Sequence, residues 1–163
     1  TKNILKSLLI TVMALSLLAV SCKKDEGGSK PTDPQTVEVD ATTITGIISA
    51  MFTMTADDSG ASLFASDTTI TPANGKATID TATGKKIADI KTKLKTSIET
   101  VASAYASVVT LTSDVDNLTK DLTLTMKPAN ANVNFTSDVT DGKTYTYDAT
   151  KGEASLVITI TEK

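Results

Sequence analysis

Residues 84–109 read GKKIADIKTKLKTSIETVASAYASVV and carry the clearest periodic pattern of the chain. Apolar side chains recur there at spacings of three and four: Ile87, Ile90, Leu94, Ile98, Val101, Tyr105 and Val108. This spacing places them on one face of an α-helix, with polar residues on the opposite face. We therefore predict a long amphipathic helix over this stretch, with Thr81 or Thr83 capping its first turn through a side-chain oxygen.

Downstream of this helix the apolar period changes to two. Apolar residues alternate with mostly polar ones in two runs: Leu122, Leu124 and Met126 in the first, and Ala154, Leu156, Ile158 and Ile160 in the second. Such alternation is typical of strands with one buried and one solvated face. Between the two runs, Gly142 and Gly152 mark turns on either side of residues 144–147. The pattern predicts an antiparallel sheet that includes the last strand.

The segment before the helix has a weaker pattern. Val37–Asp40 alternates like a strand, and residues 61–70 are predicted as another. Asn74-Gly75 favours a hairpin turn that leads into a returning strand at 77–79. Residues 44–55 (ITGIISAMFTMT) are rich in β-branched side chains and fit a strand, while the spacing of their apolar residues also fits a short helix. Both interpretations of 44–55 stay open.

The first part of the chain has the pattern of an export signal. Lys2 and Lys6 precede an apolar stretch of thirteen residues, Leu8–Val20, and charged residues follow at 23–26. A positive start, a short apolar core and small residues after it describe a secretory signal peptide. The apolar stretch is shorter than the roughly twenty residues that a membrane-spanning helix needs. We therefore predict a signal peptide over residues 1–21.

Cys22 is the only cysteine of the chain. The segment Leu18-Ala19-Val20-Ser21-Cys22 resembles the lipobox of bacterial lipoproteins, with Ala19 at the position where that family prefers leucine. The resemblance implies cleavage before Cys22 and acylation of its thiol. An unpaired cysteine in an exported protein otherwise needs an explanation. The alternative is a plain secretory signal that is cut without lipid addition and leaves a free thiol.

Residues 23–36 (KKDEGGSKPTDPQT) contain no apolar side chain, so they cannot bury surface. We predict a flexible tether over residues 22–36 and a single α+β domain over residues 37–163. The predicted fold is an antiparallel β-sheet with one long amphipathic helix packed on it. The acidic pair Asp25-Glu26 resembles the flank of Gram-negative lipoproteins exported to the outer face of the cell. Alternatively, these charges only keep the tether soluble.

The composition excludes several classes of function. The chain has no histidine, tryptophan or arginine, which excludes histidine-dependent triads and the usual zinc sites. After removal of residues 1–21, fourteen lysines (sixteen less Lys2 and Lys6) stand against nineteen acids, a net charge of −5. This charge argues against nucleic acid as a partner. We predict a non-enzymatic protein without a cofactor; a carboxylate-based hydrolase is the enzymatic alternative.

Three groups of side chains are candidates for contact or metal sites. Tyr145 and Tyr147 share a face of a predicted strand, where they contact a sugar or protein if exposed and belong to the core if buried. The helix lysines form either a solvated face or a contact with anionic lipid or polysaccharide: Lys85, Lys86, Lys91, Lys93 and Lys95. Two acidic groups offer oxygen ligands for calcium: Asp57-Asp58 with Asp67, and Asp114 with Asp116 and Asp121. Neither matches the EF-hand pattern, and we predict no metal site.

Together these patterns predict a lipoprotein of the bacterial cell envelope, held in the outer membrane by lipid on Cys22 and facing outward. The expected role is a non-enzymatic binding or surface module whose partner is a glycan or an envelope protein. The alternative is a structural or accessory subunit of an envelope assembly, or an adhesive surface layer.

Overall fold

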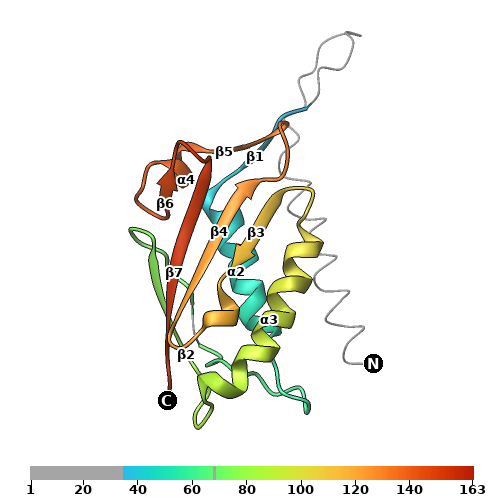
Figure 1. The fold of residues 1–163 in the computed structure, drawn as a ribbon, viewed down its shortest axis with the longest axis vertical. Helices are drawn as coiled ribbons and strands as arrows, with labels where there is room; N and C mark the ends of the chain where they lie inside the picture. Colours follow the sequence, from blue (N-terminus) through green and yellow to red (C-terminus); the bar gives the residue numbers. More distant parts are fainter. Residues whose placement is uncertain (1–34, 68) are drawn as a thin grey trace.

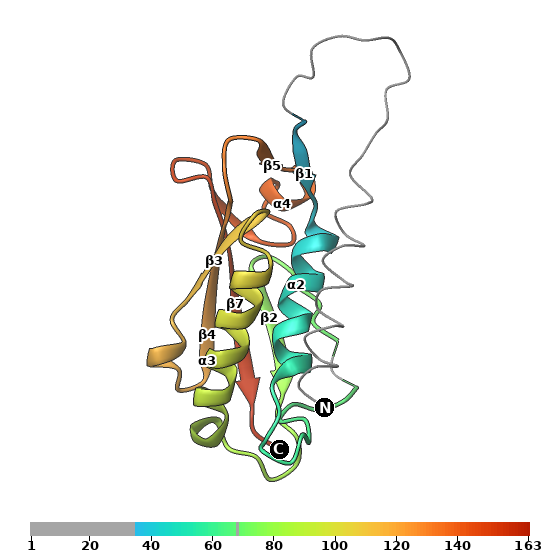
Figure 2. The ribbon, with the colours of Figure 1, turned by 90° about the vertical axis from the view of Figure 1, so that its right-hand side faces the viewer.

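The computed structural model describes residues 35–67 and 69–163. The predicted signal peptide, Cys22 and most of the predicted tether lie outside these residues. The described chain forms a five-stranded sheet with two long helices side by side on one face, as Figures 1 and 2 show. The predicted α+β class is confirmed.

The sheet is built around β7 (Glu153–Thr161). Its other strands are β2 (Lys76–Asp80), β3 (Val109–Ser113), β4 (Asp121–Pro128) and β6 (Thr146–Asp148). The order is β2-β7-β4-β3, and β6 pairs with β7 beside this path. The predicted antiparallel pairing is confirmed for β4–β7 and β6–β7. β3, which was not predicted as a strand, also pairs antiparallel with β4. The antiparallel prediction is wrong for β2, which runs parallel to β7, so the sheet is mixed.

β2 runs parallel to β7 because the predicted hairpin before it does not form. Asn74 and Gly75 do form a turn with positive φ values of 51° and 72°. Residues 61–67, 69 and 70, however, form no strand, and Ser62 and Phe64 make isolated bridges. Leu63 and Phe64 are neighbours and both are buried, whereas neighbouring side chains of a strand point to opposite faces. With no strand before the turn, β2 pairs with β7 instead.

The first helix resolves the ambiguity at residues 44–55. α2 spans Ala41–Met54, so the helix interpretation is correct and the strand interpretation is wrong. Asp40 caps it by accepting a hydrogen bond from the Thr43 backbone N–H at 2.7 Å. Its buried residues recur at helical spacing: Ala41, Ile44, Ile47, Ile48, Met51 and Phe52. Burial of this stripe outweighs the strand propensity of its β-branched residues. The fold therefore has two long helices on the sheet, where one was predicted.

The second helix is the predicted one, shorter at both ends. α3 spans Ile87–Ala104 and buries the predicted stripe from Ile87 to Val101. The predicted threonine cap is wrong, since the Thr81 hydroxyl donates to the Lys85 carbonyl. The Glu162 carboxylate accepts a hydrogen bond from the Ile87 backbone N–H at 2.8 Å instead, and this bond holds the pKa of Glu162 below its usual value. The segment after β7 therefore caps α3.

The remaining elements are short. β1 (Val37–Val39), a predicted strand, pairs in parallel with β5 (Val133–Phe135). A 3-10 helix, η1, spans Val115–Asn117, and α4 spans Ser137–Thr140. Figure 1 shows β1 at one end of the molecule and the loop after α2 at the other, near the end of β7. Among the described residues, no helix is long and apolar enough to cross a membrane.

Candidate functional site

Tyr145 is a core residue. Its side chain is completely buried, and its hydroxyl lies 2.6 Å from Thr45 Oγ1 and donates to the Ala41 carbonyl at 3.2 Å. Burial raises the pKa of this phenol to about 12. Tyr147 is partly buried and packs against the same core. The two tyrosines therefore form no exposed contact patch. The prediction that Tyr145 contacts a ligand is wrong, and the alternative, that it belongs to the core, is correct.

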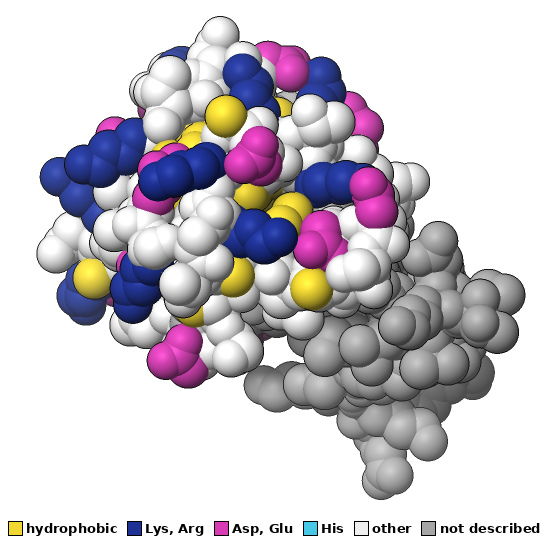
Figure 3. All heavy atoms as spheres, turned by 90° about the horizontal axis from the view of Figure 1, so that it is seen from below, with side chains coloured by type: hydrophobic (Ala, Val, Ile, Leu, Met, Phe, Trp, Pro, Cys, Tyr) yellow, Lys and Arg dark blue, Asp and Glu magenta, His cyan; other side chains and the backbone are white. Residues whose placement is uncertain are grey.

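The helix lysines are paired with oxygen acceptors. Side-chain partners are Asp57 for Lys85, Glu162 for Lys86, Asp58 for Lys93 and Asp116 for Lys95. The Lys91 ammonium donates to the backbone carbonyl of Asp116. Figure 3 views the molecule from below and shows lysines and acidic residues interleaved over its lower end. The lysines do not form a continuous basic patch of the kind that would attract an anionic membrane or polysaccharide.

A polar hollow lies between the loop after α2 and the outer face of α3. Its volume is about 400 Å³, within the usual range of small-molecule sites. The polar and charged side chains that line it include Asp57, Asp58, Ser59, Lys93, Thr96 and Thr100. We refer to it below as the polar hollow. It joins residues 57–60, which follow one helix, to residues 93–100 of the other.

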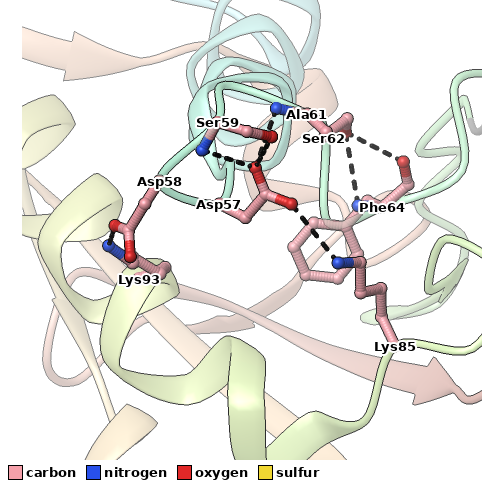
Figure 4. A network of polar contacts seen from close by, with 8 residues as sticks. All are labelled: Asp57, Asp58, Ser59, Ala61, Ser62, Phe64, Lys85 and Lys93. Carbon is pink, nitrogen blue, oxygen red and sulfur yellow. Dashed lines mark hydrogen bonds and ion pairs between the residues drawn. The ribbon is translucent and has the colours of Figure 1, made fainter.

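Asp57 organises the loop at one side of the polar hollow, as Figure 4 shows. Its Oδ1 accepts hydrogen bonds from the Ser59 hydroxyl at 2.6 Å and from the Ser59 and Ala61 backbone N–H groups, each at 3.0 Å. Its Oδ2 accepts from Lys85 Nζ at 3.3 Å. These donors, the Ser59 hydroxyl first among them, lower the pKa of Asp57 to about 2. The loop is therefore held around a carboxylate that is ionised at neutral pH.

An ion pair crosses the rim of the polar hollow. Lys93 on α3 pairs with Asp58, whose side chain is 93% exposed. Ser97 also lines the hollow, and its buried hydroxyl lies 3.0 Å from that of Thr55. Thr96 and Thr100 donate their hydroxyl protons to carbonyls one turn earlier in α3, at 3.2 and 2.8 Å. The hollow thus offers two carboxylates, one ammonium and several hydroxyl oxygens.

The acidic residues considered for calcium are held apart in the described part of the chain. No three His, Cys, Asp or Glu side chains gather there in an arrangement that would hold a metal. Asp114 accepts from the Thr123 backbone N–H at 2.7 Å, and Asp121 accepts from the Thr159 hydroxyl at 2.7 Å. Asp116 pairs with Lys95. Each carboxylate thus serves a local structural contact.

A second, less polar hollow of about 240 Å³ lies between α2, residues 62–66 with Ile70, and β2. Phe52 and Phe64 line it and meet edge to face, with ring centroids 4.9 Å apart. Both rings are almost completely buried, so they offer little surface to a ligand.

The sequence pointed to some residues of the polar hollow but did not show that they lie together. Asp57 and Asp58 stood out as an acidic pair, and Lys93 as one of several helix lysines. Thr96 and Thr100 were expected only as part of the polar face of the helix, and Ser59 was not identified. Nothing local shows that the loop folds back onto this face of α3. The short spacing from Asp57 to Ser59 and Gly60 was the available signal, since Asp followed by Ser and Gly is typical of a side-chain-stabilised turn.

No known protein family, curated protein or solved structure matches this chain. Its function must be inferred from its own residues and their arrangement.

The Asp57 network makes a prediction about acid stability. Because the folded pKa of about 2 lies below the ordinary 3.8, the carboxylate contributes stability that is fully present above pH 4 and lost as the pH falls toward 2. Asp57→Asn should therefore unfold at lower urea concentration than the parent protein at pH 7, and the difference should shrink between pH 4 and pH 2. Asp58→Asn is the control, since this neighbouring side chain is exposed and pairs with Lys93. A constant difference across this pH range would contradict the assignment.

Proposed function

We propose that this protein is a lipid-anchored lipoprotein of the bacterial cell envelope that presents a non-enzymatic binding domain. The lipobox resemblance at Cys22 supports the anchor and, with Asp25-Glu26, an outer-membrane location facing outward. Two or three acyl chains would hold the protein firmly, since each buried methylene contributes about 0.8 kcal/mol. The partner would be a glycan or an envelope protein, reached from the membrane through the predicted tether.

The position of the polar hollow is the observation that supports a binding role. The domain begins at β1, next to the predicted tether, and α2 leads from there to the loop at residues 57–60, as Figures 1 and 2 show. The fourteen residues of α2 span about 20 Å. The hollow therefore lies at the opposite end of the domain from β1, the strand with which the domain begins. This placement suits a module that binds a partner outside the membrane surface.

The chemistry of the hollow suits binding better than catalysis. A carboxyl with a pKa of about 2 is a poor general acid or base at neutral pH. The second carboxylate, Asp58, is paired with Lys93. The chain also has no histidine to move protons. These side chains can accept and donate hydrogen bonds to a ligand, which is the function we propose for them.

The lipid anchor can be tested directly on Cys22. Mass spectrometry of the mature protein should find a chain that begins at Cys22 and carries a diacylglyceryl group on its thiol. Cys22→Ser should abolish this modification. Essentially no lipid-modified protein should then remain in the membrane fraction. Ser29→Ala in the predicted tether is the control and should leave processing unchanged. An unmodified Cys22, or a chain that still carries Leu8–Val20, would overturn the proposal.

The outward orientation and the binding role need separate measurements. Protease treatment of intact cells should remove the domain if it faces outward and spare it if it faces the periplasm. A pulldown that returns one envelope protein in a fixed ratio would instead favour the role of an accessory subunit.

A further inference from the structure

We propose that the polar hollow binds a neutral, polyhydroxylated ligand, namely a saccharide. The inference rests on the proposed function as a binding module and adds the site and the class of ligand. Three observations carry it: the balance of charges around the hollow, the use of its hydroxyl protons, and the rigidity of its loop.

The charges around the hollow cancel in pairs. Asp57 is paired with Lys85 at 3.3 Å, and Asp58 is paired with Lys93. A phosphate, sulfate or carboxylate ligand would meet a carboxylate beside every ammonium, and a cation would meet an ammonium beside every carboxylate. Like charges at such distances disfavour either ligand. A neutral ligand avoids this repulsion and can use both members of the rim pair.

The hydroxyl groups of the hollow are committed as donors and remain available as acceptors. Ser59 donates to Asp57, Thr96 to the Thr92 carbonyl, and Thr100 to the Thr96 carbonyl. A hydroxyl has one proton and two lone pairs, so these oxygens can only accept from a ligand. The complementary ligand must therefore bring several hydrogen-bond donors, and the hydroxyl groups of a sugar supply them.

The Asp58–Lys93 pair suits two neighbouring hydroxyls of a sugar ring. A carboxylate accepts up to four hydrogen bonds and an ammonium donates three, so each partner keeps capacity beyond the bond they share. One ligand hydroxyl can donate to Asp58 while its neighbour accepts from Lys93. Hydrogen bonds to charged groups are the stronger kind, which gives the rim pair the leading part in binding.

The loop that carries Asp58 and Ser59 is already ordered without a ligand. Asp57 receives hydrogen bonds from Ser59, Ala61 and Lys85, so little ordering is left to occur on binding, and preorganisation favours affinity. The residues lining the hollow include no aromatic ring, so stacking does not add to binding. We expect affinity of about millimolar for one or two sugar units, since only hydrogen bonds contribute.

The test is a titration of the full chain, purified in a detergent without a sugar headgroup and followed by two-dimensional amide NMR. The probes are maltose, D-glucuronate and D-glucosamine, which are neutral, anionic and cationic. Maltose should produce saturable shifts of the amides of Ser59, Gly60, Thr96 and Thr100, with weaker effects from both charged sugars. No saturable shift of these amides up to about 100 mM maltose, well above the millimolar affinity expected from hydrogen bonds alone, would overturn the inference. So would tighter binding of either charged sugar.

Matched variants show whether the named side chains carry the binding. Lys93→Met and Thr100→Val should each weaken maltose binding about fivefold or more, as loss of one hydrogen bond to a ligand does. The controls are Lys91→Met and Thr92→Val, which lie on the same helix outside the hollow and should leave binding unchanged. Equal effects in variants and controls would contradict the site.

This titration is independent of the anchor. A failure of the lipoprotein assignment appears in the mass of the mature N-terminus and leaves the titration unaffected. A failure of the present inference appears only in the titration.

Discussion

Tyr145→Ala should lower the free energy of unfolding by about 4 kcal/mol, because a large buried aromatic side chain is removed from a packed core. The ring has no exposed surface. Its hydroxyl also ties residue 145 to α2 through Thr45 and the Ala41 carbonyl. The measurement is urea unfolding at neutral pH, followed by circular dichroism.

Two further variants separate the ring from its hydroxyl. Tyr145→Phe keeps the ring and should cost about 1 kcal/mol, the usual value of one hydrogen bond. Tyr147→Ala removes a side chain that is only partly buried and should cost clearly less than Tyr145→Ala. If Tyr145→Ala were as stable as the parent protein, Tyr145 would not be the core contact that we describe.

Gly75→Ala should destabilise the domain by about 3 kcal/mol or more, the sum of a left-handed backbone penalty and overpacking. Gly75 has a φ of +72°, and a Cβ there would lie 2.1 Å from Thr146 Oγ1 and 3.0 Å from the Thr146 backbone nitrogen. The turn at Asn74-Gly75 is also hydrogen-bonded to the backbone carbonyls of Lys143 and Thr144. The added methyl would therefore push the turn away from β6.

Gly142 provides the matched control for this steric effect. Its φ is +78°, and a Cβ there would meet nothing within 4 Å. Gly142→Ala should therefore cost only the backbone penalty of about 1 kcal/mol. Adding Thr146→Ala to Gly75→Ala should recover part of the loss, because it removes the nearest contact. Thermal unfolding of the variants tests this, and equal destabilisation by both glycine substitutions would refute the steric argument.

The candidate site shows where sequence reasoning stops. The polar face of α3, including Lys93, Thr96 and Thr100, followed from its apolar stripe, because residues on one helix have a known angular relation. That residues 57–60 lie against this face did not follow, because the contact joins positions about 35 residues apart. The same limit applies to Glu162, which caps α3 from 75 positions away.

By itself, the sequence determined the elements with strong local periodicity. The buried stripe of α3 and the alternating strands β4 and β7 were predicted, since a helix or strand imposes its period on neighbouring residues. The sequence also determined the absence of histidine and the lipobox resemblance at Cys22. Residues 44–55 lay at the boundary, because their composition favoured a strand and their spacing a helix.

The tertiary structure decided how these elements combine. It selected a helix for α2 and a parallel partner for β2, buried Tyr145, and brought residues 57–60 onto α3. In each case the outcome depends on which distant apolar surface a segment can bury and which distant donor or acceptor it meets. Those energies are set by contacts between segments far apart in the chain, which local patterns do not contain.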